Sequence, residues 1–145
     1  MAILNISAKT EYACIALLEL AANYGSGEPV RIRTIAETHG IPSRFLVQIL
    51  LQLKGARLVS STRGAAGGYQ LVKDPHDITL GEVMALVEGH PGEPVSNAAV
   101  KTETSRVLLS AWREVAAVQR DMLASITFAD LVERISGQAE NMYYI

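Results

Sequence analysis

Apolar residues recur at helical spacing through the first third of the chain. Residues 7–24 carry a broad apolar face and are followed by a Gly-Ser-Gly stretch, which predicts a helix that ends there. Residues 30–32 are either a short extended piece or the entry to a second helix, expected from Thr34 to His39. Gly40 would stop that helix as a left-handed C-cap glycine does. Residues 41–43 open a third predicted helix that runs to about residue 55, because its apolar residues follow the spacing i, i+3, i+4 and i+7: Leu46, Ile49, Leu50 and Leu53.

The pattern then changes to that of strands. Residues 58–63 and 68–72 are rich in strand-forming residues, and a glycine-rich stretch at 64–68 joins them. This stretch has no Walker lysine and leads into a strand, so it is not a phosphate-binding loop. Two helices around a tight glycine turn, followed by a hairpin with a basic tip, are typical of a winged helix-turn-helix domain. The predicted fold class is therefore mainly α with a small β-hairpin wing.

The second half of the chain is predicted to be helical. Thr79 and Glu82 have capping-box spacing, which indicates a helix over 80–88. A long helix follows at 103–125, and another begins at Thr127. We expect four parts: a winged helix-turn-helix DNA-binding domain, a loop, a dimerisation helix with a C-terminal helix, and a flexible tail, at residues 1–89, 90–102, 103–137 and 138–145.

The long helix has a wider apolar side than a single small domain needs. That side either packs on its own domain or meets a second copy of the chain, and the spacing alone does not separate these two interpretations. Dimerisation is favoured, because one small module binds DNA weakly and two-fold operators need two copies. The residues expected at the dimer interface are Leu108, Trp112, Val115 and Met122.

Charge is distributed unevenly along the chain. The net charge is −2, but residues 31–73 hold seven basic residues and only Glu37 as an acid, a local charge of +6. The remaining residues hold six basic and fourteen acidic side chains, a charge of −8. A basic segment of this kind is what neutralisation of DNA phosphates requires, although scattered solvated charge is the plainer alternative.

Composition excludes several other classes of protein. With 49% hydrophobic and 19% charged residues the chain is globular rather than disordered. Cys14 is the sole cysteine, so one chain forms no disulfide and no multi-cysteine metal site, and we expect no cofactor and no metal. No signal peptide and no apolar run of about 20 residues is found, so we expect no membrane contact and a cytoplasmic protein. The three histidines lack ligand-like spacing and no nucleophile elbow is present, so an enzyme is not expected.

Several stretches together resemble one bacterial family, the Rrf-two family of winged helix-turn-helix transcriptional regulators. The most specific is the glycine-rich wing, Arg-Gly-Ala-Ala-Gly-Gly-Tyr at residues 63–69. The similarity spans nearly the whole chain. The other matching stretches are residues 9–13, 16–21, 35–42, 44–50, 78–80, 87–89 and 126–131.

The resemblance implies a homodimeric transcription factor with crossed long helices. It places Arg44, Phe45 and Gln48 in the major groove of double-stranded DNA and Arg63 at the wing tip near the minor groove. The chemistry agrees, because Gln pairs with adenine, Arg binds guanine or phosphate, and Arg favours a narrow minor groove. Phe45 as a core residue and Gln48 as a merely solvated one remain alternatives. The full expected DNA-binding set is Arg33, Arg44, Phe45, Gln48, Ser61 and Arg63.

The chain departs from the family pattern at two places. Many relatives carry an acidic residue just before the glutamine, where this chain has Val47. Cluster-binding relatives place three cysteines before the long helix, and residues 90–106 contain none. We therefore expect a sequence-specific, cluster-free regulator, a repressor, with an unknown small-molecule or protein effector. The alternative is a winged-helix interaction module that has lost operator binding and regulates a partner protein.

Overall fold

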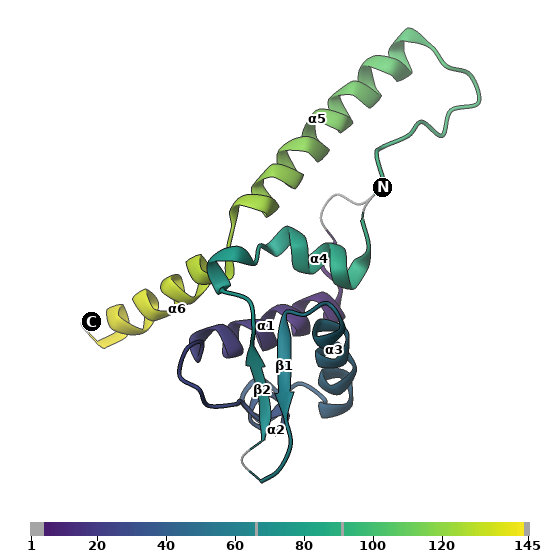
Figure 1. Cartoon of the computed structure of the whole chain (residues 1–145). Coiled ribbons are helices and arrows are strands. Elements are labelled where there is room, and N and C mark those ends of the chain that lie inside the picture. Colours follow the sequence, from purple (N-terminus) through teal and green to yellow (C-terminus); the bar gives the residue numbers. More distant parts are fainter. Residues whose placement is uncertain (1–4, 66, 91, 144–145) are drawn as a thin grey trace.

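The computed structural model describes residues 5–65, 67–90 and 92–143. Within them the chain is mostly helical, with one two-stranded antiparallel hairpin, as the sequence predicts (Figure 1). The elements are α1 (Ala8–Ala22), α2 (Ile32–His39), α3 (Ser43–Gly55), β1 (Val59–Thr62), β2 (Gly68–Leu71), the 3-10 turn η1 (Pro75–Asp77), α4 (Leu80–Glu88), α5 (Glu103–Ser125) and α6 (Phe128–Tyr143).

The hydrophobic core is built around α1. This helix packs against α3, α4, α6 and the second strand of the hairpin. The predicted stripe of α3 is buried, and Phe128 at the start of α6 returns to the same core. Burying these side chains is the main term that stabilises the fold. The largest fully buried residues are Leu17, Leu20, Ile35, Leu46, Ile49, Leu50, Leu53, Ile78, Val83 and Phe128.

The second helix begins earlier than predicted. Val30 forms a β-bridge with Tyr69, with two backbone hydrogen bonds of 2.8 Å, and α2 starts at Ile32 rather than Thr34. The contact with the hairpin lies far away in the sequence, so the local pattern did not reveal it. At the other end Gly40 is left-handed, with φ of 65°, as predicted for the helix-turn-helix turn.

The hairpin has the predicted order but shorter strands. Its register pairs Val59 with Leu71 and Thr62 with Gly68. Gly68 lies directly against the Val30 backbone, because a Cβ added to it would come 2.4 Å from the Val30 carbonyl oxygen. A glycine is therefore required where the wing crosses the entry to α2.

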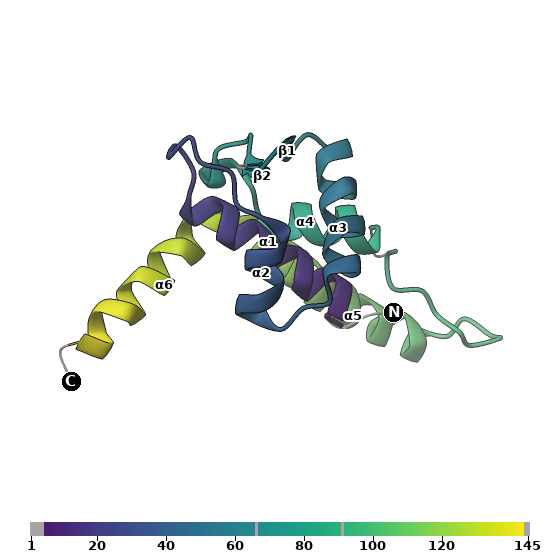
Figure 2. The same cartoon turned by 90° about the horizontal axis from the view of Figure 1, so that it is seen from below.

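The long helix runs out beyond the body formed by α1 to α4 and the hairpin (Figure 1), and seen from below it lies behind α1 and α3 (Figure 2). It spans residues 103–125 as predicted and contains no buried residue. Backbone hydrogen bonds then bring the chain back: Leu80 donates to Ile126, and Phe128 donates to Ile78. The protruding helix is thus fixed to the core at its C-terminal end.

The prediction of a flexible tail at residues 138–145 is wrong for residues 138–143, which are helical. Helix α6 continues through residues 138–143, because Gln138, Ala139 and Glu140 favour helices and Gly137 does not interrupt them. Residues 144–145 lie outside the described part of the chain.

Candidate nucleic-acid interface

The side of α3 opposite its buried stripe is the outward face of the helix-turn-helix. Arg44 and Gln48 lie one turn apart on this side, and both are exposed. One flank is tied to α4, because the Gln52 side chain donates to the Leu86 carbonyl at 2.9 Å. The other flank is tied to the hairpin, because Lys54 donates to the Ser61 hydroxyl at 2.6 Å. These ties fix how α3 presents Arg44 and Gln48.

Phe45 lies at the edge of this face. Its side chain is 44% exposed, so it is not a core residue. Its ring centroid is 6.4 Å from that of Tyr12 on α1, and the Arg44 guanidinium lies 5.5 Å from the Phe45 ring. A cation over an aromatic face is a weak attraction that restrains the arginine.

The hairpin tip is fastened to the start of α2. The Arg31 guanidinium donates a hydrogen bond to the Ala65 carbonyl oxygen. Arg63 is exposed at the end of β1. Sequence reasoning missed the role of Arg31, since only the folded hairpin brings residues 31 and 65 together.

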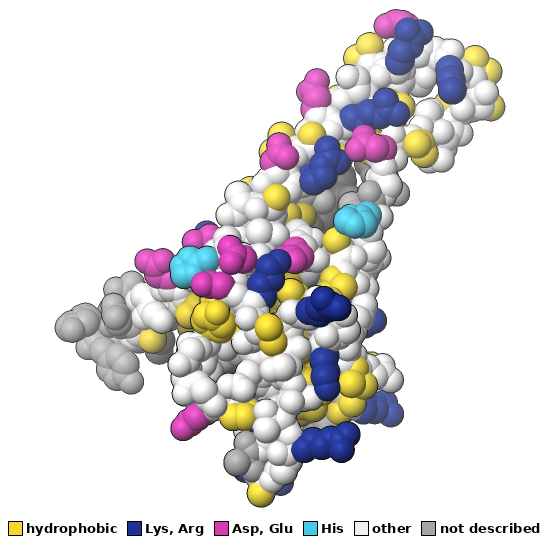
Figure 3. Space-filling view, viewed as in Figure 1, with side chains coloured by type: hydrophobic (Ala, Val, Ile, Leu, Met, Phe, Trp, Pro, Cys, Tyr) yellow, Lys and Arg dark blue, Asp and Glu magenta, His cyan; other side chains and the backbone are white. Residues whose placement is uncertain are grey.

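The remaining two expected residues are also exposed, and each already has a partner. Arg33 pairs with Glu37 at 2.8 Å, and that hydrogen bond raises the pKa of Arg33. Ser61 accepts the bond from Lys54. Lys and Arg side chains gather over α3 and the hairpin in Figure 3, and others follow α5. All six predicted DNA-binding residues thus lie on the surface of the helix-turn-helix and wing.

Helix α5 carries one broad apolar side. Leu108, Val115 and Met122 are seven residues apart and exposed, and they form an open stripe along the helix. Trp112 is four residues after Leu108 and three before Val115, so it lies on the same side of the helix. Trp112, Val115 and Leu123 line a cavity of about 590 Å³ between α4, α5 and residues 89–90 and 92–94. Val115 therefore belongs both to the stripe and to the wall of this cavity.

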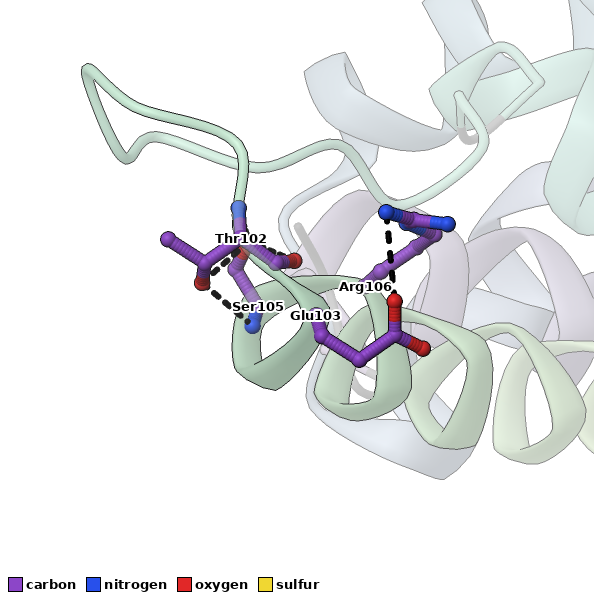
Figure 4. Close-up of polar contacts among 4 residues, drawn as sticks. All are labelled: Thr102, Glu103, Ser105 and Arg106. Atoms are coloured by element: carbon purple, nitrogen blue, oxygen red, sulfur yellow. Dashed lines mark hydrogen bonds and ion pairs between the residues drawn. The ribbon is translucent and has the colours of Figure 1, made fainter.

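Polar contacts hold the loop before α5 in place. Arg120 pairs with Glu93 at 3.1 Å, and Arg113 donates to the Pro94 carbonyl oxygen at 3.3 Å. The first turn of α5 is closed by a capping box between Thr102 and Ser105 (Figure 4). The Glu103–Arg106 ion pair, 3.2 Å long, lies beside it.

Comparison with known protein families identifies the family of this chain. The family model described as "Rrf2: Iron-dependent Transcriptional regulator" matches residues 6–134. The chain belongs to the Rrf2 family. The resemblance found in the sequence is therefore confirmed, and its relatives are named as transcriptional regulators rather than enzymes.

Two Rrf2 relatives are similar over most of the chain. CymR, an HTH-type transcriptional regulator of Bacillus subtilis, is 33% identical over 143 residues, 98% of this chain and all of CymR. IscR of Vibrio cholerae is 30% identical over 131 residues, 89% of this chain and 75% of IscR.

Solved Rrf2 structures have the same fold. The structure of CymR, described as the global cysteine regulator of B. subtilis, matches with a TM-score of 0.79 at 33% identity, covering 91% of this chain and 98% of that one. IscR of T. potens matches with a TM-score of 0.73 at 31% identity, covering 92% and 89%. The winged-helix class predicted from the sequence is confirmed by these matches.

The donor set does not fit the iron chemistry that the Rrf2 description implies. The chain has one cysteine, Cys14 on α1, and burial raises the pKa of its thiol to about 11. Thiolate is the form that binds iron, so this thiol is a poor ligand at neutral pH. Within residues 5–65, 67–90 and 92–143 no group of three or more His, Cys, Asp or Glu side chains is placed to hold a metal ion.

The same described residues contain no helix with the length and apolar character needed to cross a bilayer.

Proposed function

We propose that this Rrf2 protein is a sequence-specific DNA-binding repressor that acts as a homodimer without an iron–sulfur cluster. The observation that carries the proposal is the outward face of α3. Arg44 and Gln48 stand opposite the buried stripe, and Arg63 is exposed at the tip of the adjoining hairpin. An exposed recognition helix beside a basic wing fits the major and minor grooves of one duplex.

Each residue then has a defined role. Gln48 forms paired hydrogen bonds with adenine, and Arg44 binds guanine or a neighbouring phosphate. Arg63 enters the minor groove, where a narrow groove concentrates negative potential. Arg33 and Ser61 bind phosphates, and Phe45 restrains Arg44 against the helix.

The homodimer is supported by the open stripe of α5. Leu108, Val115 and Met122 are large apolar side chains left in solvent by one copy of the chain. A seven-residue repeat is the pattern with which two helices bury such residues against each other. Pairing through α5 would give two recognition helices related by a two-fold axis, as a palindromic operator requires.

The simplest way for such a protein to repress transcription is to occupy its operator. A bound dimer blocks other proteins from the operator, so no further surface is needed. We place this activity in the cytoplasm, where the bacterial chromosome lies.

Without an iron–sulfur cluster, the signal that controls DNA binding would be a small molecule or a partner protein. For a small molecule we place the site in the cavity beside Trp112, whose volume suits such a ligand. Trp112 is the sole tryptophan, so its fluorescence would report occupancy.

The proposal is tested by selecting a randomised duplex pool with the purified, metal-free protein at two salt concentrations. We expect a palindromic motif to be recovered at both. Binding that is only salt-sensitive and yields no motif would reduce the basic segment to a nonspecific phosphate contact. Under that outcome the interaction-module alternative would account better for the fold.

Arg63→Ala is expected to weaken binding to the selected operator roughly tenfold, since it removes a charged contact in the minor groove. Arg134→Ala on α6 is the matched control, because it removes the same charge away from the wing. Equal affinities for the two variants in a fluorescence-anisotropy titration would contradict the role of Arg63.

A further inference from the structure

Two large apolar side chains lie in solvent on the outward half of α3. Val47 is 40% exposed and Leu51 is 54% exposed. They are four residues apart, so they are neighbours on the helix surface and form one small apolar patch. Single exposed apolar residues are ordinary, but this pair lies within the helix predicted to contact DNA.

The patch has a defined place beside the hydrogen-bonding residues. Leu51 lies on the side opposite the core, one turn after Gln48 on the same face. Val47 is rotated toward the hairpin, on the flank where Lys54 reaches Ser61. The apolar patch therefore lies between Gln48 and the wing-facing edge of α3.

Only one apolar group is offered on the floor of the major groove. The other distinguishing base-edge groups there donate or accept hydrogen bonds, whereas thymine presents a 5-methyl group where cytosine has only a hydrogen. Valine and leucine side chains cannot satisfy a donor or acceptor, so they disfavour positions where such a group would be buried.

We propose that Val47 and Leu51 bind thymine methyl groups and so require thymine in each half-site next to the base contacted by Gln48. This inference rests on the proposed DNA binding. The surrounding charge favours DNA over an apolar protein partner, because Arg44 and Lys54 flank the patch within a segment of net charge +6.

The test changes the DNA by one methyl group at a time. Each thymine of the selected operator is replaced by deoxyuridine, which keeps every hydrogen bond and lacks only the methyl. For the wild-type protein we expect a three- to tenfold loss of affinity at one or two positions per half-site, the effect of burying about one methyl. 5-Methylcytosine at those positions should bind better than cytosine.

Protein variants show whether Val47 and Leu51 are responsible. In Val47→Asn and Leu51→Asn the penalty for deoxyuridine should fall below twofold at the affected position, because a polar amide replaces the apolar partner. Ile135→Asn changes another exposed apolar residue on α6 in the same way and is the matched control, which should keep the full penalty. All three residues are exposed, so the variants are expected to fold.

The possible results distinguish failure of the thymine contact from failure of the proposed DNA binding. A selected operator with no thymine in its half-sites, or with no deoxyuridine effect, overturns the thymine contact alone. Equal penalties in the variants and the wild type also overturn it. Failure to select any motif overturns the proposed function and this inference together.

Discussion

At the residue scale, the sequence predicted correctly those contacts whose two residues lie close together in the chain. Gly40 ends α2 in the left-handed conformation, and the Thr79 hydroxyl caps α4 through the backbone of Glu82. The Glu82 carboxylate, however, binds Lys73 at 2.9 Å. The contact between Phe45 and Tyr12 joins two helices, and no spacing rule predicts it.

Arg57 is in a conformation that side chains with a Cβ adopt reluctantly. Its φ is 66°, two residues after the end of α3. Arg57→Gly should raise the free energy of unfolding by about 0.5–1 kcal/mol, because the strain of the left-handed region exceeds the extra entropy that glycine loses. Urea denaturation compared with Arg57→Ala checks this. Equal stability of the two variants would show that the backbone at residue 57 is not strained.

At the element scale, the positions of α3, α4 and α5 could be predicted because each carries its own apolar pattern, and Thr79 marks the start of α4 as its cap. The start of α2 could not, since the Val30–Tyr69 bridge determines it. The length of α6 was also misjudged, since nothing in the local pattern ends it at residue 137.

Hydrogen bonds join the start of α1 to the end of α4. Thr10, only 1% exposed, donates to the Glu88 carboxylate at 2.6 Å, and Ser7 donates to the same oxygen. These bonds hold the pKa of Glu88 below its ordinary value of 4.5. The charged form of Glu88 therefore ties the start of α1 to the end of α4.

Glu88→Gln should lower stability at neutral pH. The lowered pKa of Glu88 means that its contribution is present above pH 4.5, the ordinary value, and is lost as the pH falls through the folded-state pKa. The stability difference from wild type should thus shrink below pH 4.5. Thermal unfolding across pH measures it, with Glu114→Gln on α5 as control. A difference that stays constant with pH would mean that the charge of Glu88 is not the cause.

At the scale of the whole molecule, the sequence predicted the winged-helix class but not the cavity between α4 and α5. Helical spacing placed Trp112 with Leu108, Val115 and Met122. In the structure Trp112 and Val115 both line the cavity between α4 and α5, where Arg120 and Arg113 hold Glu93 and Pro94 against the helix. Leu108 and Met122 lie outside the cavity lining.

Val115→Glu should dissociate the proposed dimer, because it would bury a charge in the middle of the α5 seam. Ser110→Glu adds the same charge on the polar side of α5 and should leave the dimer intact. Sedimentation equilibrium distinguishes the two. A Val115→Glu protein that stays dimeric would place the interface elsewhere.

The most direct test of the whole account is the dependence of binding on the distance between half-sites. Two recognition helices held by one dimer reach the same face of the duplex only when the half-sites are a whole number of turns apart. Inserting about five base pairs, half a helical turn, between the half-sites of the selected operator should lower the affinity at least roughly tenfold, and a further five should restore part of it. Affinity that ignores the insertion would contradict a homodimer that reads a palindrome.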